Sequence, residues 1–255
     1  MLAVERQQRI LYLLNEQKTV KVTELSEFFS VTEETIRRDL EKLENEKKLA
    51  RSYGGAVSVQ EQDDMEIPYT ERKVINRKEK MEIAHEAVKQ VVDGDTIILD
   101  ASTTAWYMAK ALPNIPITVL TNSIQVVMAL SRKKEMTVIS AGGVLLPDSL
   151  SYVGPLAEAS IGTYRVNKAF ISCKGLHFER GLSELDERQA LIKKKMIACA
   201  ESTFLMLDHS KFGVQAFSRI TGLDEICHVI TDSKVSKEIT KRLAEKSLNH
   251  IKVCY

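Results

Sequence analysis

Residues suited to binding an anion stand at positions 100–104 of the chain. An apolar run at 97–99 stops at Asp100, and Ser102, Thr103 and Thr104 follow before a second apolar segment begins. This order predicts a buried strand, a turn and a helix. Hydroxyls and free backbone N–H groups at the start of a helix can bind an anion such as phosphate. The turn alone leaves open whether that anion is a substrate or a signal.

Four later apolar runs also end in small polar residues, glycines or lysines. These residues are Thr121, Asn122 and Ser123, then Gly142 and Gly143, then Lys174 and Gly175, and finally Asp208, His209, Ser210 and Lys211. Hydroxyl and amide groups can bond sugar hydroxyls, whereas backbone N–H groups and lysine can bind phosphate. If the runs are parallel strands, their carboxyl ends meet at one edge, which is where open α/β sheets bind ligands.

Helix capping is the alternative for each cluster taken singly, because polar residues after a strand commonly cap the next helix. Five clusters at one edge favour a ligand site. His209 by itself is more typical of a packed or solvated histidine than of a catalytic base. The pair Gly142-Gly143 lacks the GxGxxG spacing of a dinucleotide site.

The elements that would position these residues alternate along the chain. Helical patterns are found at 78–92, 104–112, 123–132, 187–200 and 235–246. Strands are expected at 96–100, 117–121, 136–141, 167–173, 203–208 and 228–232. Such alternation predicts an α/β domain whose mostly parallel sheet is covered on both faces.

Three further helical patterns occupy the start of the chain, at 3–16, 24–30 and 33–47. Thr23 and Thr32 are candidate N-caps for the second and third of these helices. Two helices joined by so short a turn form a helix-turn-helix. Residues 47–59 predict a hairpin, or wing, because Gly54 and Gly55 allow a tight turn between two short strands.

The outward face of the third helix carries the groups that a DNA-recognition helix needs. At about 100° per residue, Ile36, Leu40 and Leu43 form an apolar stripe, and Arg38 lies nearly opposite. The polar residues beside Arg38 or at the margin are Thr35, Glu34, Lys42 and Arg37. Arginine can pair with guanine or phosphate, and threonine can contact a thymine methyl. A merely solvated surface is the alternative, since residues 1–58 hold ten Lys or Arg and ten Asp or Glu, a sum of zero.

The segment 6–56 resembles the winged helix-turn-helix of DeoR-type bacterial regulators. The sequences TIRRDLEKLE and GGA, at 35–44 and 54–56, carry the resemblance. It implies a helix-turn-helix near residues 20–39 and binding to double-stranded operator DNA. The candidate DNA-binding residues are Thr32, Glu34, Thr35, Arg37, Arg38, Lys42, Arg51 and Tyr53.

The resemblance continues through ILDASTTAWYMAKAL, TNS, AFISCKGL and LMLDHSKFG, which are similar to the sensor domain of the DeoR family. It implies the ribose-5-phosphate isomerase fold and a phosphorylated sugar or sugar derivative as effector. Family members often have glycine where this chain has Ala101, and a methyl group there would narrow the site or reshape the turn. The candidate effector-binding residues are Asp100, Ser102, Thr103, Thr104, Thr121, Asn122, Ser123, Gly143, Lys174, Gly175, Asp208 and Lys211.

Composition narrows the class of protein. The chain has 255 residues, a formal charge of +1, 44% hydrophobic residues and no apolar run long enough for a membrane span. Its start suits an amphipathic helix and not a signal peptide. The four cysteines are widely spaced, at Cys173, Cys199, Cys227 and Cys254. This spacing argues against a zinc site and suits a cytoplasmic protein with reduced thiols, so we expect no metal and no cofactor.

Three functions remain open: a sensor, an isomerase, and a DNA-binding protein without a ligand. An isomerase needs a base and a cation, for which the candidates are Glu184, Asp186, Glu187, Lys193 and Lys211. The recognition helix favours a sensor without catalytic residues. We expect a winged helix-turn-helix at 1–58, a linker at 59–75 and an α/β effector-sensing domain at 76–255. The resemblance implies a repressor of a carbohydrate-utilisation operon, and operator length implies a dimer or tetramer.

Overall fold

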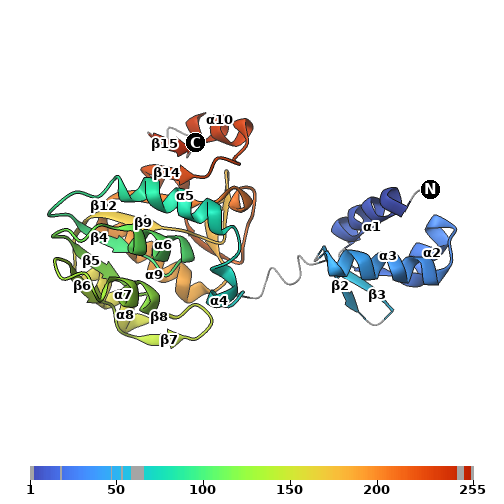
Figure 1. Cartoon of the computed structure of the whole chain (residues 1–255), viewed down its shortest axis with the longest axis horizontal. Helices are drawn as coiled ribbons and strands as arrows, with labels where there is room; N and C mark the ends of the chain where they lie inside the picture. The colour runs from blue at the N-terminus through green and yellow to red at the C-terminus, as the bar shows by residue number, and fades with distance from the viewer. Residues whose placement is uncertain are drawn as a thin grey trace. The chain divides into compact units, whose positions relative to one another are not determined.

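The computed structural model describes residues 3–17, 19–46, 48–52, 54–58, 66–245 and 250–253. Two compact units make up the chain, Met1–Met65 and Glu66–Tyr255 (Figure 1). None of the helices in the described ranges is long and apolar enough to cross a membrane.

The first unit is a three-helix domain with a small antiparallel sheet. Its elements are α1 (Ala3–Gln17), β1 (Thr19–Lys21), α2 (Val22–Phe29), α3 (Glu33–Asn45), β2 (Leu49–Ser52) and β3 (Gly55–Ser58). The predicted helices and the β2–β3 hairpin are present, and β1 adds a third strand beside β3. The apolar stripe of α3 is buried, with Ile36, Leu40 and Leu43 at most 1% exposed. These side chains pack on Ile10 and Leu14 of α1.

One predicted cap of the first unit is wrong. Helix α2 starts at Val22, and its N-cap Lys21 makes no side-chain cap hydrogen bond, so Thr23 lies inside the helix. The reason is the pairing of Lys21 with Gly55, which ends β1 there and lets the N–H of Val22 donate to the carbonyl of Gly54 at 2.9 Å. The cap predicted at Thr32 is confirmed, because its Oγ1 accepts from the N–H of Thr35 at 3.3 Å.

The second unit is built on a seven-stranded sheet in the order β15-β14-β12-β9-β4-β5-β6, in which every adjacent pair is parallel. The strands are β4 (Thr96–Leu99), β5 (Thr118–Thr121), β6 (Thr137–Ser140), β9 (Val166–Ile171), β12 (Ala200–Leu207), β14 (His228–Thr231) and β15 (His250–Val253). The helices are α4 (Tyr69–Arg72), α5 (Arg77–Val88), α6 (Thr103–Ala111), α7 (Ile124–Leu130), α8 (Pro155–Gly162), α9 (Glu187–Cys199) and α10 (Lys237–Glu245). The predicted parallel α/β domain is confirmed.

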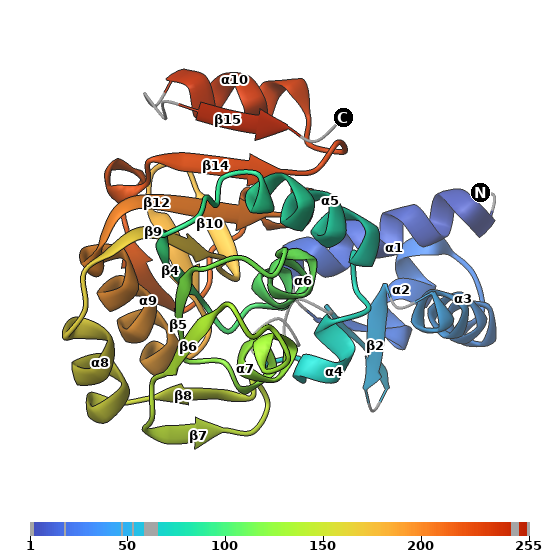
Figure 2. The ribbon, with the colours of Figure 1, turned by 60° about the vertical axis from the view of Figure 1, so that its left-hand side comes forward.

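Helices cover both faces of this sheet (Figure 2). Ile97 and Leu99 of β4 belong to the core that also contains Ile83 of α5 and Met108 of α6, whereas Ile98 faces the core that contains Met196 of α9. Because successive strand residues point to opposite faces, a sheet buried on both sides requires continuous apolar strands. This explains why the strands are unbroken apolar runs in the sequence.

Two small sheets, the helices α4 and α8, and the edge strand β15 are additions that the sequence did not indicate. A hairpin joins β7 (Val144–Leu146) to β8 (Ser151–Val153), and a second sheet joins β10 (Gly175–His177), β11 (Gly181–Glu184) and β13 (Ser218–Thr221).

Helix α4 lies inside the expected linker at 59–75. The side chain of Tyr69 is only 3% exposed, and the second unit therefore begins at Glu66 instead of at 76. The expected linker differs from the structure in its second half because α4 packs on the α/β domain.

Candidate functional site

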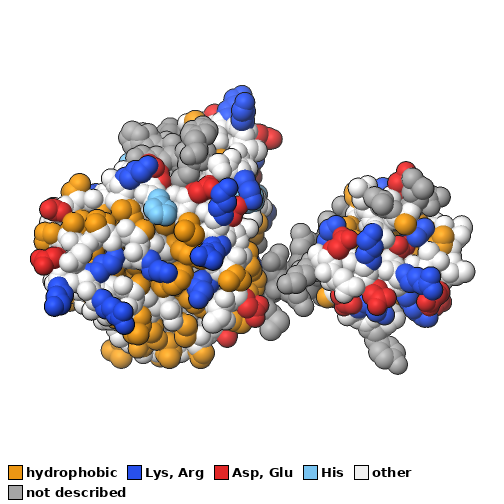
Figure 3. All heavy atoms as spheres, in the orientation of Figure 1, with side chains coloured by type: hydrophobic (Ala, Val, Ile, Leu, Met, Phe, Trp, Pro, Cys, Tyr) orange, Lys and Arg blue, Asp and Glu red, His pale blue; other side chains and the backbone are white. Residues whose placement is uncertain are grey.

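The candidate DNA surface is the exposed side of α3. The side chains of Arg37 and Arg38 are 53% and 78% exposed. Arg37 is bonded to Glu33 at 2.8 Å, whereas Arg38 lies 3.6 Å from Glu34 in a looser contact. Such exposed pairs contribute little to stability, so both arginines can change partner. The space-filling view shows acidic and basic side chains mixed on this unit, consistent with its balanced charge (Figure 3).

The other predicted DNA-binding residues share this surface in part. Thr32, Glu34, Lys42 and Arg51 are exposed, and Thr35 is half-buried. Tyr53 lies outside the described residues. A hollow of about 250 Å³ lies beside the wing, and its lining includes Arg37 of α3 and Arg51 of β2. Two cations at one small hollow suit a DNA phosphate.

A buried ion pair that the sequence did not reveal holds α3 in place. Asp39 is 4% exposed, and its carboxylate accepts from Arg6 at 2.5 Å and from Gln7 at 2.8 Å. Both partners belong to α1. A charge on an otherwise apolar helix face was the available signal, since Asp39 lies three residues after Ile36 and four before Leu43.

The candidate effector site lies where the order of successive strands in the sheet reverses. The chain runs outward from β4 through β5 to β6, and outward on the other side from β9 through β12 to β14. Strands β4 and β9 are therefore the topological switch point, beyond whose carboxyl ends ligands bind in such sheets. Asp100 follows β4 and is fully buried. Its carboxylate accepts from the N–H of Ser102 at 3.1 Å and from the N–H of Ser172 at 2.9 Å.

Lys193 of α9 completes a buried charged cluster with Asp100 and Glu184. Its Nζ lies 3.3 Å from Asp100 Oδ2, donates to the carbonyl of Ser172 at 2.7 Å, and bonds Glu184. Burial by itself would lower the pKa of Lys193, but the charges of Glu184 and Asp100 outweigh burial and raise that pKa. The lysine is therefore a fixed cation. Burial raises the pKa of the nearby Cys173 thiol to about 12, which leaves it protonated.

The hydroxyl residues after β4 and β5 act partly as helix caps. Ser102 Oγ accepts from the N–H of Ala105 at 3.0 Å, and Ser123 Oγ accepts from the N–H of Val126 at 3.3 Å. Each hydroxyl still has a hydrogen to donate. Thr103 and Thr104 are buried in the first turn of α6. The capping alternative thus holds for both serines without excluding a ligand.

Other predicted residues lie at the same edge with structural roles. Thr121 Oγ1 accepts from the N–H of Ser123, and the amide of Asn122 donates to the carbonyl of Tyr152 at 2.9 Å. A Cβ on Gly143 would meet Val153 O at 2.7 Å, and one on Gly175 would meet Val214 O at 2.4 Å, so both glycines permit close packing. The remaining candidates that follow strands are half-buried or buried: Lys174, Asp208 and Lys211.

Sequence reasoning missed two groups at this edge. Gln189, one helical turn before Lys193, donates to Ser149 at 2.9 Å and to Ser151 at 2.6 Å. Asn76, just before α5, donates to Asp208 at 3.0 Å. The spacing of 189 and 193 on one helix face was the signal for the first group.

The carboxylates considered for isomerase chemistry separate in the structure. Glu184 joins the buried cluster, whereas Asp186 caps α9 and pairs with Arg188 at 2.6 Å. The bond to Arg188 is the main cause that lowers the pKa of Asp186. Asp186 therefore has a structural role at the start of a helix.

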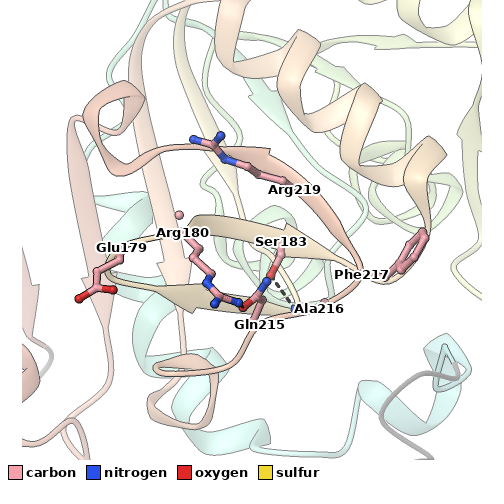
Figure 4. Close-up of a pocket in the computed structure, with 8 residues that line it drawn as sticks. Glu179, Arg180, Ser183, Gln215, Ala216, Phe217 and Arg219 are labelled. Atoms are coloured by element: carbon pink, nitrogen blue, oxygen red, sulfur yellow. Dashed lines mark hydrogen bonds between the residues drawn. The ribbon is translucent and has the colours of Figure 1, made fainter.

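A second hollow, of about 350 Å³, opens on the β10–β11–β13 sheet (Figure 4). Arg180 and Arg219 line it, and Arg180 is bonded to Gln215 at 2.5 Å. Phe217, at its margin, is 85% exposed. None of the predicted effector residues lines this hollow.

Comparisons with known proteins agree with this architecture. The family described as the DeoR-like helix-turn-helix domain matches residues 6–62, and the DeoR C terminal sensor domain matches residues 75–233. A protein of Bacillus subtilis (strain 168), named "Uncharacterized HTH-type transcriptional regulator YulB", is 54% identical over 97% of this chain and 96% of its own length. The "L-fucose operon activator" of Haemophilus influenzae is 35% identical over 92% of this chain and 94% of its own length.

Among solved structures, ribose 5-phosphate isomerase A from Methanocaldococcus jannaschii is 19% identical, with a TM-score of 0.41 over 54% of this chain and 55% of that chain. The sequence relatives and the two matched domains establish the family. The chain belongs to the DeoR family of transcriptional regulators, with an N-terminal helix-turn-helix domain and a C-terminal sensor domain.

Proposed function

We propose that this regulator is a cytoplasmic repressor of a carbohydrate-utilisation operon, released from its operator by a phosphorylated sugar or sugar derivative. The observation that supports such an effector is the arrangement of residues at the corner between β4 and β9. There, Asp100 and Lys193 are fixed beside the hydroxyl-rich start of α6. A helix start supports an anion, and buried carboxylate and hydroxyl groups support binding to sugar hydroxyls.

DNA binding is supported by the family and by the exposed cations of α3. Arg38 points away from the buried stripe, and Arg37 shares a hollow with Arg51 of the wing. One small winged module reads few base pairs, so we propose a homodimer or homotetramer that contacts two half-sites.

Sensing is favoured over turnover by the state of the buried carboxylate. Glu184 is already bonded to Lys193, and a paired carboxylate is a poor general base. The isomerase alternative predicts that a sugar phosphate is converted by the purified protein. Proton NMR of each sugar phosphate incubated with the protein distinguishes an enzyme from a sensor.

The central test measures affinity for DNA. Selection from random-sequence duplexes gives a preferred duplex, and a scrambled duplex of equal composition is the control. Fluorescence anisotropy at fixed salt should show a preference for the selected duplex, because phosphate contacts alone do not discriminate sequence. One phosphorylated sugar of a panel should weaken that binding, while its unphosphorylated partner should not.

Equal affinity for the selected and scrambled duplexes would refute sequence-specific binding. Unchanged DNA affinity across the whole panel would refute the phosphorylated effector. The sign of regulation needs a separate measurement, since one relative is named as an activator. A reporter gene behind the selected duplex should be transcribed less when the protein is present, and activation would contradict the repressor.

A further inference from the structure

Arg72 of α4 has two buried guanidinium nitrogens without a partner among the described residues. Its Nη1 pairs with Glu66 at 3.0 Å, whereas Nε and Nη2 are buried and make no hydrogen bond. Nε–H and one Nη2–H lie along the same edge of the guanidinium plane. That edge matches two oxygens of a carboxylate or phosphate group. A buried charged donor without an acceptor is costly, so its presence requires an explanation.

Helix α4 holds this arginine beside the effector site. The N–H of Tyr69 donates to the carbonyl of Asp148 at 2.7 Å, and the Tyr69 ring packs edge-on against Trp106 at 6.4 Å. Tyr107 donates to the carbonyl of Lys73 at 2.9 Å. These contacts fix α4 against the first turns of α6, the helix whose start lies beyond β4 (Figure 2).

Glu66, the ion-pair partner of Arg72, interacts electrostatically with the buried charged cluster. Burial raises the pKa of Glu66, with Arg72 opposing burial and Glu184 adding to it, and Lys193 also acts on this carboxyl. Glu66 therefore lies within electrostatic range of both Glu184 and Lys193. Lys193 is already committed to Asp100 and Glu184. Arg72, in contrast, offers a cation with a free hydrogen-bonding edge.

Three more buried groups lack partners in the described part of the chain, and two of them belong to residues near this corner, since the third is the hydroxyl of Thr231 at the end of β14. The hydroxyl of Tyr69 is one, and burial raises the pKa of Tyr69, so this hydroxyl remains a donor. The side-chain oxygen of Asn122 is the other, and Asn122 follows β5, the neighbour of β4. Together with Arg72 they provide donors for an oxyanion and an acceptor for a hydroxyl, the groups present in a sugar phosphate or a sugar acid.

We propose that Arg72 binds an oxyanion of the effector through its Nε–Nη2 edge, with the Tyr69 hydroxyl as a second donor. This inference rests on the proposed function and adds the residue that reads the anion. Segment 66–76 begins directly after the first unit ends and leads into α5. Anion binding therefore stabilises α4 at the point where the α/β domain begins.

Glu66 acts as an internal competitor in this proposal. Its carboxylate already neutralises part of the Arg72 charge and repels an incoming anion. Glu66→Gln should therefore bind the anion more tightly, while Arg72→Lys should bind it at least about tenfold more weakly, because lysine lacks the two-pronged edge. A purely structural role of the pair predicts that both variants change anion affinity alike or leave it unchanged.

The test uses the full chain with two probes, inorganic phosphate and acetate, which separate phosphate from carboxylate recognition. The Nε–H signal of Arg72 is followed by ¹⁵N–¹H NMR and assigned from its absence in Arg72→Lys. Arg77→Lys is the matched control, since Arg77 is exposed in the first turn of α5. One probe should shift the Arg72 signal in the wild type and in Arg77→Lys, and Glu66→Gln should saturate at lower concentration.

No shift with either probe would overturn the proposal. Wild-type affinity of Arg72→Lys for the probe that binds, measured by calorimetry because this variant has no Arg72 signal, would overturn it as well. Circular dichroism of each variant shows that it is folded. DNA measurements separate this proposal from the proposed function. Release of Arg72→Lys from DNA by a phosphorylated sugar as in the wild type leaves the function standing and removes Arg72 from it. A shifted Arg72 signal without any change in DNA affinity supports anion binding by Arg72 and contradicts the proposed release from DNA.

Discussion

At the scale of single residues, exposure separates side chains that are predicted to read DNA from those that support the fold. Arg38 and Leu40 are two positions apart on α3, yet the Arg38 side chain is 78% exposed and Leu40 is 1% exposed. Helical geometry alone produces this contrast, because residues two apart point in nearly opposite directions. The two positions therefore make a matched pair for mutation.

Arg38→Ala should weaken specific DNA binding by about 1–3 kcal/mol per half-site, since a lost base contact costs that much. Stability should hardly change, because the contact with Glu34 is exposed. Leu40→Ala should instead destabilise the first unit by about 2–5 kcal/mol, measured by hydrogen exchange of α3 amides. Wild-type affinity of Arg38→Ala in fluorescence anisotropy would show that another residue reads the DNA.

Lys80 gives a pH-dependent prediction of known sign. Burial, opposed by Asp208, lowers the pKa of Lys80 to about 8 in the folded chain. Below pH 8 Lys80 is protonated in both the folded and the unfolded chain. Between pH 8 and the unfolded value of about 10.4, the unfolded chain binds more protons, so stability from this group rises with pH, by up to about 3 kcal/mol.

Urea unfolding followed by the single tryptophan, Trp106, measures this effect in the second unit. The stability of the wild type relative to Lys80→Met should increase from pH 8 to pH 10. Lys78→Met is the control, because the Lys78 side chain is 86% exposed. A constant difference between wild type and Lys80→Met over this range would mean that the buried lysine keeps its ordinary pKa.

At the scale of elements, the turn between α2 and α3 contains backbone strain. Ser30 caps α2 in the left-handed region, with φ 52° and ψ 46°, where residues other than glycine pay a steric cost. Ser30→Gly should stabilise the first unit by about 0.5–1 kcal/mol, seen as slower hydrogen exchange in α3. Ser26→Gly, inside α2, should destabilise it by a similar amount. Faster exchange in Ser30→Gly would show that the serine side chain stabilises the turn.

The same scale explains how α9 organises the candidate effector site. Gln189 and Lys193 are four residues apart and project from one face of the helix, so a single element supplies both the amide for Ser149 and Ser151 and the cation for Asp100. Asp186 fixes where this helix begins, since its side chain accepts from the N–H groups of Arg188 and Gln189. The cap thus sets the positions of both the Gln189 and the Lys193 side chains.

At the scale of the whole molecule, the proposed function requires coupling between effector and DNA. If the effector weakens operator binding by a coupling energy of about 1–3 kcal/mol, or about 5- to 150-fold, linkage demands that operator weakens effector binding by the same factor. Calorimetry of the active phosphorylated sugar, with and without the selected duplex, should show that reciprocal factor. Unequal factors at one salt concentration would mean that a third equilibrium, such as subunit association, takes part.

The sequence by itself determined the local elements. Apolar periodicity predicted the helices of the first unit, the outward position of Arg38 and the alternation that builds a parallel sheet, because these properties depend on residues a few positions apart. It also placed Asp100 and Ser102 at the end of a strand. The roles of the predicted DNA and effector residues stay predictions.

Tertiary structure decided which distant residues meet. The strand order put β9 beside β4, which joined Asp100 to Ser172 and brought Lys193 and Glu184 to the same corner. Packing of α4 placed part of an expected linker against the α/β domain and buried two guanidinium nitrogens of Arg72. Residues as far apart as 100 and 172 leave no joint periodicity in one sequence. Their contact depends on strand order and long-range packing, which only the folded chain specifies.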